Sequence, residues 1–203
     1  MNGVIVVDKA KGNTSFDEIR KIRKEYTIKK VGHTGTLDPM ATGVLTILVG
    51  EATKLSDYLM NHDKEYVATL SLGEKRDTGD SEGKIIETKK VPDLSEKNVK
   101  ETLKSFEGEI SQIPPKYSAI KVNGKKLYEY ARSGEEIEIK PRKVNIFEIN
   151  LIEIKENSIT FKVHCSKGTY IRTLCEDIAE KLGTVGYMSS LRRTRVGNFT
   201  LDD

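Results

Sequence analysis

The chain has 203 residues, of which 36% are hydrophobic and 32% are charged, and 34 Lys and Arg against 31 Asp and Glu leave a net charge of +3. This length predicts a single domain over 1–203 with a sizeable core. Two cysteines, Cys165 and Cys175, are too few for a disulfide framework and lack metal-type spacing, so we expect them in the core. The chain enters a strand-like run directly, without a signal peptide or a membrane-length apolar stretch, which predicts a cytoplasmic protein.

The N-terminal third is predicted to alternate between buried strands and helices. "GVIVVDK" (3–9) is a β-branched apolar run typical of a buried strand. Ser15 and Glu18 match a capping box, and Phe16, Ile19, Ile22 and Tyr26 follow at helical spacing, which predicts an amphipathic helix. A buried strand at 44–49, a short helix within 53–62 and an alternating strand at 65–73 come next.

The remaining elements favour hairpins. Residues 84–90 follow the turn-rich "TGDSEGK" and could pair back on the preceding strand. Asn123-Gly124 is the strongest short-range hairpin signal in the chain. The other expected elements are a helix from Ser95 with Val99, Leu103 and Phe106 on its apolar face, long strands at 144–154 and 158–165, and a helix bearing Ile171, Leu174, Ile178 and Leu182. Because the strands come in hairpins and not in strict βαβ order, the sequence predicts an α+β fold with a mixed, largely antiparallel β-sheet core flanked by helices and loops.

The stretch "VGHTGTLDPMATGVL" (31–45) is the clearest candidate for a functional loop. It lies between a predicted helix and a buried strand, where functional loops are often held by a rigid scaffold. Pro39 restricts the backbone of Asp38, and the surrounding glycines and threonines allow close approach and hydrogen bonding to a ligand. No Gly-Lys-Ser/Thr follows, so a P-loop is excluded. The alternative is a turn in which Asp38 caps its own backbone.

"CSKGTYIRTL" (165–174) places Lys167 and Arg172 near the start of a predicted helix, with no acidic residue before Glu176. Cations there oppose the helix dipole, by about 0.3–1 kcal/mol each at a surface. Such an arrangement is typical of a partner anion, and Asp38 is a natural candidate for Arg172. A plain surface arginine is an equally good interpretation of this stretch alone.

"GHTGTLDPMATGVL", "IPPKYSAIKVNGKKLYEYARSG" and "CSKGTYIRTL" resemble the signature segments of the TruB family of tRNA pseudouridine synthases, and "GVIVVDKAKGNTSFD" and "SSLRRTRVGNF" match in kind. The resemblance runs from about residue 3 to about residue 199. It implies the pseudouridine synthase fold and the isomerisation of a uridine in the T-arm loop of tRNA, with no metal or organic cofactor. Bacterial members usually continue into a C-terminal RNA-binding PUA domain, so we expect these 203 residues to be the catalytic domain, either as a fragment or as a naturally short form.

The resemblance also implies site residues. The family's catalytic aspartate falls on Asp38, and attack on the sugar, addition to the ring and removal of the 2′ proton all stay open for it. The stacking tyrosine falls on Tyr66 and a second pocket tyrosine on Tyr170. The remaining implied substrate-binding residues are His33, otherwise a surface loop histidine, Leu191, otherwise a core residue, Arg172, and Lys9, otherwise a solvated strand-end lysine.

Basic and aromatic residues alternate over 117–143, a pattern that suits RNA contact but is also found on a solvated charged face. The family uses a mobile thumb-like insertion here, which favours RNA contact. We therefore expect a tRNA T-arm stem-loop as the partner, with no membrane contact, no obligate protein partner and a monomeric enzyme. Two other hypotheses stay open: a non-catalytic RNA-binding or tRNA-folding module of the same fold, and a relative of the guide-RNA-dependent branch, which requires protein partners.

Overall fold

A computed structural model describes residues 1–118 and 120–202. Its main sheet has eight strands, seven of them in the order β1-β3-β12-β4-β11-β10-β7. The eighth, β2, pairs with the C-terminal end of β3. All of these pairs are antiparallel except β12 with β3. The strands of this sheet are β1 (Gly3–Lys9), β2 (Val31–His33), β3 (Thr42–Val49), β4 (Lys64–Leu72), β7 (Gly108–Gln112), β10 (Arg142–Lys155), β11 (Ser158–Cys165) and β12 (Gly186–Val196). The expected α+β fold with a mixed, largely antiparallel sheet is confirmed.

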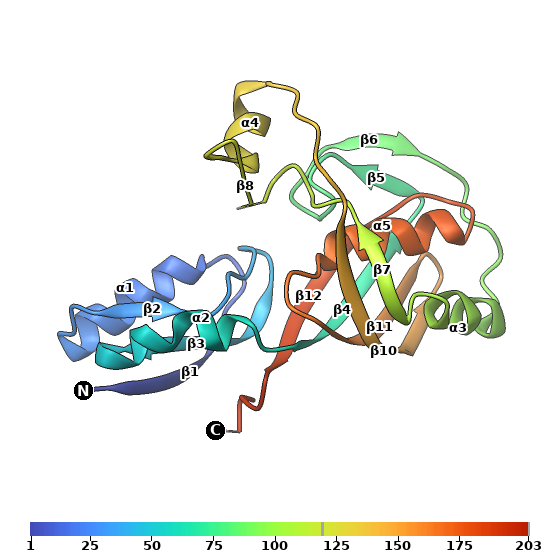
Figure 1. Ribbon diagram of the computed structural model, residues 1–203. Helices are drawn as coiled ribbons and strands as arrows, with labels where there is room; N and C mark the ends of the chain where they lie inside the picture. The colour runs from blue at the N-terminus through green and yellow to red at the C-terminus, as the bar shows by residue number, and fades with distance from the viewer. Residues whose placement is uncertain (119, 203) are drawn as a thin grey trace.

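Helices cover this sheet in two groups, which Figure 1 shows side by side. One group lies with β1, β2 and β3, and the other lies with β4, β7 and β10 to β12. The first group is α1 (Ser15–Tyr26), a 3-10 helix (Gly50–Leu55) and α2 (Ser56–Met60); the second is α3 (Glu96–Lys104) and α5 (Ile171–Lys181). Each group has its own apolar core, the first around Ile19, Leu45 and Ile47 and the second around Leu70, Phe161 and Leu174. No helix in the described part of the chain is long and apolar enough to cross a membrane.

The two parts of the sheet meet where β12 runs beside β3. The pairing is parallel and joins Arg192 to Thr42 and Arg193 to Gly43. Gly43 has a φ of +101°, and a Cβ atom added there would stand 2.1 Å from the Arg193 carbonyl oxygen. Glycine is required at this position because both the backbone conformation and the close approach exclude a side chain.

Two hairpins stand outside the main sheet. β5 (Glu74–Arg76) pairs with β6 (Ile85–Thr88), as the turn-rich sequence between them predicts. β8 (Lys121–Val122) pairs with β9 (Lys125–Lys126) through Asn123 and Gly124, both at positive φ, which confirms the Asn-Gly hairpin. The second hairpin and α4 (Leu127–Ser133) lie apart from the body of the molecule in Figure 1, within the expected thumb-like segment 117–143, of which residue 119 lies outside the described residues.

Several local predictions need correction. Helix α1 is capped by Thr14 and Asp17, one residue before the predicted Ser15–Glu18 pair, because the side chain of Ser15 turns inward to the loop containing Leu37. Of the predicted apolar face, Ile19 and Ile22 are buried but Phe16 and Tyr26 are each 47% exposed. The stretch 31–45 is not all loop, since β2 occupies its first three residues and β3 begins at Thr42.

Strands β7 and β12 have no counterpart among the predicted elements. β7 has only five residues. β12 carries register shifts between Met188 and Ser190 and between Arg193 and Arg195, and such bulges break the period-two alternation from which a strand is predicted. The core positions of Cys165 and Cys175 agree with expectation, because both thiols are free and buried.

Candidate active site

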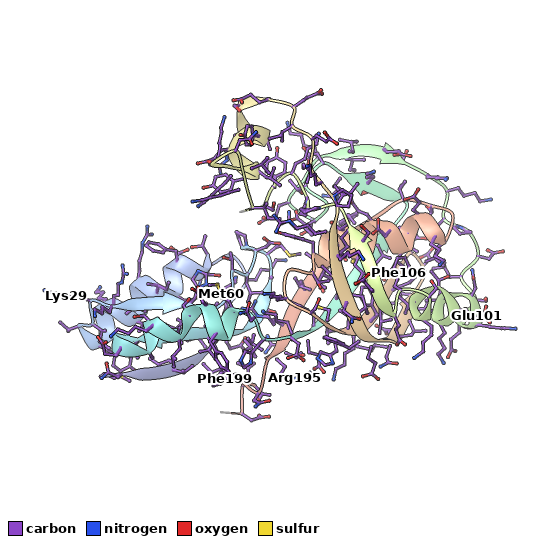
Figure 2. All side chains as sticks on the ribbon, viewed as in Figure 1. Lys29, Met60, Glu101, Phe106, Arg195 and Phe199 are labelled. Carbon is purple, nitrogen blue, oxygen red and sulfur yellow. The ribbon has the colours of Figure 1, made fainter. Side chains whose placement is uncertain are left out.

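A cavity of about 500 Å³ opens between the two parts of the molecule. Its lining comes from the loop before β3, the start of β4, the middle of β12 and the start of α5, with Tyr117, Ser118 and Tyr128 also contributing. Met60, at the end of α2 and labelled in Figure 2, is also a lining residue. Five of the expected site residues line this one cavity: Asp38, Tyr66, Tyr170, Arg172 and Leu191.

Asp38 is held by contacts to the residues on either side of it. The backbone amide of Leu37 donates to the Ser15 hydroxyl at 2.9 Å. The carbonyl of Pro39 accepts from the Gly12 amide at 2.8 Å and from the Lys9 ammonium at 3.3 Å. The loop is therefore fixed to α1 and to the end of β1, which leaves the carboxylate of Asp38 directed at the cavity with its side chain 33% exposed.

Arg172 comes from the first turn of α5 and its side chain is only 7% exposed. Its Nε lies 3.2 Å from Oδ2 of Asp38, and its Nη1 lies 3.8 Å from Oδ2 of Asp80. The remaining donors reach the carbonyl oxygens of Thr78 at 3.2 Å and Tyr117 at 3.0 Å. A buried guanidinium whose nitrogens all have oxygen partners is held in one orientation. It therefore orients the carboxylate that faces it.

The charge of Asp38 depends on opposing influences. Burial raises the pKa of its carboxyl above the usual value, and the charge of Arg172 acts in the opposite direction. The carboxylate of Asp80 raises the pKa of Asp38 further, whereas the Lys9 ammonium lowers it. A carboxylate that is partly desolvated and held by one arginine is more reactive than one in water, while the arginine favours its ionised form.

Aromatic and apolar side chains form the wall beside Asp38. Tyr66 points inward from β4 and is 8% exposed, and Leu191 lies on the neighbouring strand β12, where its backbone pairs with Ala68. Burial raises the pKa of the Tyr66 phenol, so it stays neutral. Such a surface can accept the flat face of a base, because a base and an aromatic ring stack without sequence preference.

Tyr170 immediately precedes α5 and is fixed through its backbone. The side-chain oxygen of Gln112 accepts from the Tyr170 amide at 2.9 Å, and the Gln112 amide donates to the Tyr170 carbonyl at 3.2 Å. Gln112 is 1% exposed and ends β7. A strand that the sequence did not predict therefore positions one of the expected site residues.

His33 and Lys9 do not line the cavity. His33 lies in β2, where its Nδ1 accepts from the Gly35 amide at 3.2 Å. Burial and the nearby charge of Arg193 lower the pKa of His33, which favours the neutral ring. Lys9 is fully buried and donates to the carbonyls of Ala10, Asn13 and Pro39. The interpretation of Lys9 as a solvated strand-end lysine is therefore wrong.

Two further cavity residues escaped the sequence analysis. Arg193 is 2% exposed, and its guanidinium donates to the carbonyls of Val44 at 2.8 Å and Gly35 at 3.1 Å. Lys64 is 7% exposed and donates to the carbonyls of Met60 and His62, and burial lowers its pKa to about 8. A charged residue within a strand is normally expected in solvent, so only alternation along "KEYVATLSL" could have placed Lys64 inside.

No group of three or more His, Cys, Asp or Glu side chains gathers as a metal site within 1–118 and 120–202. The charged side chains at the cavity are the Asp38–Arg172 pair, with tyrosines beside it, together with Lys64 and Arg193.

Comparisons with known proteins identify the family of the chain. The model for the N-terminal domain of the TruB family of pseudouridylate synthases matches residues 23–171, and a tRNA pseudouridylate synthase B C-terminal domain model matches 172–203. Proteins named tRNA pseudouridine synthase B from Clostridium tetani and Caldanaerobacter subterraneus are each 52% identical over the whole chain. The chain spans 70% and 71% of their lengths, respectively.

Solved structures place the fold in the same class. A Cbf5–Nop10–Gar1 complex superposes with a TM-score of 0.77 at 34% identity, over 98% of this chain and 50% of that one. An H/ACA ribonucleoprotein bound to a substrate RNA containing 2′-deoxyuridine gives a TM-score of 0.73 at 32% identity, and the chain spans 49% of its length. The fold is that of the pseudouridine synthases. Within this class the chain belongs to the TruB family.

Proposed function

We propose that this chain isomerises a uridine in the T-arm loop of tRNA to pseudouridine, with Asp38 as the catalytic nucleophile or base. The relatives named tRNA pseudouridine synthase B, about half identical over the full chain, support the reaction and the substrate class. The observation that carries the proposal is the carboxylate of Asp38 at an open cavity, 3.2 Å from the buried guanidinium of Arg172.

The reaction exchanges one bond for another. The bond from the sugar C1′ to N1 of uracil breaks, the base turns, and a bond from C1′ to C5 forms. C5 then loses a proton and N1 gains one, so atoms and electrons balance without an oxidant or a reductant. Whether Asp38 attacks C1′, adds to the ring or removes the 2′ proton, the reacting form is the ionised carboxylate, which Arg172 stabilises.

The target base leaves the stack of the T-loop and enters the cavity. Unstacking costs a few kcal/mol, and each base–aromatic contact restores roughly 1–3 kcal/mol. Among the tyrosines that line the cavity, Tyr66 and Tyr170 supply such contacts, and Leu191 packs on the uracil. Apolar packing around the ring also excludes water from a sugar carbon that becomes electron-poor during the reaction.

The RNA outside the cavity contacts the thumb-like segment 117–143 and the end of β2 at His33. The cations of α4 and its hairpin lie against aromatic rings, with Lys125 Nζ 4.6 Å from the Tyr130 ring and Arg132 Cζ 5.4 Å from the Tyr128 ring. Cations of this segment can contact phosphates, and phosphate contacts position an RNA without reading its sequence. The chain acts on tRNA as a monomer, without an obligate protein partner or cofactor.

Incubation of the protein with an unmodified T-arm stem-loop, followed by pseudouridine mapping, tests the proposal. Pseudouridine at a single loop position, formed without guide RNA or added protein, is the expected result. A non-catalytic RNA-binding or tRNA-folding module would retain the hairpin and form none. Product that depends on a guide RNA would place the chain in the other branch of the fold.

A further inference from the structure

A second groove, of about 570 Å³, adjoins the active-site cavity. The two share Met60, Gly168 and Tyr170 among their lining residues, so an RNA strand that enters the cavity can continue into the groove. The groove is lined by the end of α2, the start of β10 and the loop before α5. Tyr170 is the one residue of this groove that has been given a role at the reacting base, and Ile120, Arg142 and Lys143 belong to the segment 117–143.

Cations dominate this groove. Arg142, Lys143 and Lys167 line it, against the single carboxylate of Asp57. Lys143 is paired with Glu109 at 2.8 Å, so much of its charge is already balanced. The other two cations, Arg142 and Lys167, have no carboxylate partner among the described residues, and their charges decide what the groove can bind.

The ammonium of Lys167 donates to the side-chain oxygen of Asn61 at 2.6 Å, a neutral partner that leaves its positive charge uncompensated. The guanidinium of Arg142 makes no hydrogen bond or ion pair with any other residue that the structure describes, and the side chain is exposed. Lys167 also lies close to the N-terminus of α5, where the helix dipole disfavours a cation and favours an anion. Two uncompensated cations beside an adjoining cavity therefore favour an anionic ligand that extends from it.

We propose that this groove binds backbone phosphates of the RNA strand next to the target uridine, through Arg142 and Lys167. The inference rests on the proposed function, because it assigns a path to the strand that leaves the cavity. A flipped nucleotide stays connected to its neighbours through phosphodiesters, so the strand must leave the cavity on both sides. The shared lining at Met60, Gly168 and Tyr170 gives it one exit, and the two cations lie along that exit.

Substitutions that remove charge but keep hydrogen-bonding capacity test the groove. The variants are Arg142→Gln, Lys167→Gln and the control Lys97→Gln, which removes an exposed lysine on α3, a helix at the right-hand edge of the molecule in Figure 1. Binding of the T-arm stem-loop is titrated over a salt series. Each groove variant is expected to bind roughly fivefold more weakly at 0.1 M salt and to lower the salt slope by about 0.7–0.9. The control is expected to match the unaltered protein.

Neutral methylphosphonate linkages, placed one at a time on either side of the target uridine, identify the phosphates. If Arg142 or Lys167 contacts a given phosphate, neutralising that phosphate weakens binding to the unaltered protein but adds little to the matching variant. Unchanged salt slopes, or methylphosphonate effects that add fully to both variants at every position, would overturn the proposal.

Measuring the rate of pseudouridine formation separates the test of this groove from the test of the proposed function. At saturating RNA the single-turnover rate is expected to stay within about twofold of the unaltered protein, because neither cation touches the reacting carboxylate. An unaltered protein that binds the hairpin but forms no pseudouridine would defeat the proposed function, while the salt slopes would still report on the groove.

Discussion

The side chain of Ser15 and the backbone of Leu37 are joined across 22 residues, with the Leu37 amide 2.9 Å from the Ser15 hydroxyl and the Leu37 carbonyl 3.4 Å from it. Leu37 is the residue before Asp38, and Ser15 is 3% exposed. A side chain in the first turn of α1 thus sets the backbone from which the proposed catalytic carboxylate projects.

Ser15→Ala is expected to lower kcat by roughly ten- to hundredfold, because a small displacement of a reacting group has a large effect on rate. It should also cost about 1–3 kcal/mol of stability, since the buried Leu37 amide loses its partner. The control is Thr14→Ala, which removes the neighbouring helix cap at a cost of about 1 kcal/mol without touching the loop. Equal kcat values for the two variants, measured well below their melting temperatures, would show that Ser15 acts on stability alone.

Asp38→Asn is expected to abolish pseudouridine formation and to leave RNA binding nearly unchanged. The amide has almost the same shape as the carboxylate but cannot serve as a nucleophile or base. Single-turnover assays and binding titrations with the T-arm stem-loop measure the two properties separately. Turnover above a small fraction of the unaltered rate would remove Asp38 from the catalytic role.

The acid limb of the pH–rate profile should report the ionisation of Asp38. Its pKa is raised by burial and by Asp80 and lowered by Arg172, and the ionised form reacts, so rate is lost as pH falls through this raised value. Asp80→Asn removes a like charge and should move the limb to lower pH. Arg172→Met removes the stabilising cation and should move it to higher pH. Shifts in the same direction for both variants would contradict this assignment of charges.

Lys64 should make stability depend on pH in the alkaline range. Its folded pKa is about 8 against 10.5 in the unfolded chain, so between these values the unfolded state binds more protons and stability rises with pH. The unaltered protein is therefore expected to gain stability relative to Lys64→Met from about pH 8 upward. Urea unfolding at a series of pH values measures the difference. A constant difference across this range would mean that Lys64 keeps its ordinary pKa.

Local patterns predicted most of the secondary structure but not the way in which the elements join. The alternation in β4 and the helical spacing in α5 are visible in the sequence because each element buries one continuous face. β12 is hidden because bulges interrupt its alternation, and it is this strand that joins the two parts of the sheet. Long-range pairing leaves little trace in a single sequence, because its partners are set by the whole fold.

The candidate site, like the fold, could be predicted in part from the sequence. The chemistry of "TGTLDP" and the unbalanced Arg172 suggested a carboxylate–guanidinium pair, and the structure places the two side chains in contact. The supporting residues were not foreseen. Gln112 and Ser15 act through hydrogen bonds to the backbone of distant residues, and no residue type or spacing in the sequence marks such bonds.

The short parallel seam between β3 and β12 has a consequence for how the enzyme comes to be active. Asp38 belongs to the part of the chain on one side of that seam, and Arg172 and Tyr170 belong to the part on the other. The apolar cores of the two parts are not independent, because Leu37, Met40 and Ala41, next to Asp38, pack in the core that contains Leu70, Phe161 and Leu174. The aspartate–arginine pair is therefore completed only where the two parts of the sheet are joined, with the Gly43 backbone against Arg193, and neither part contains the pair alone.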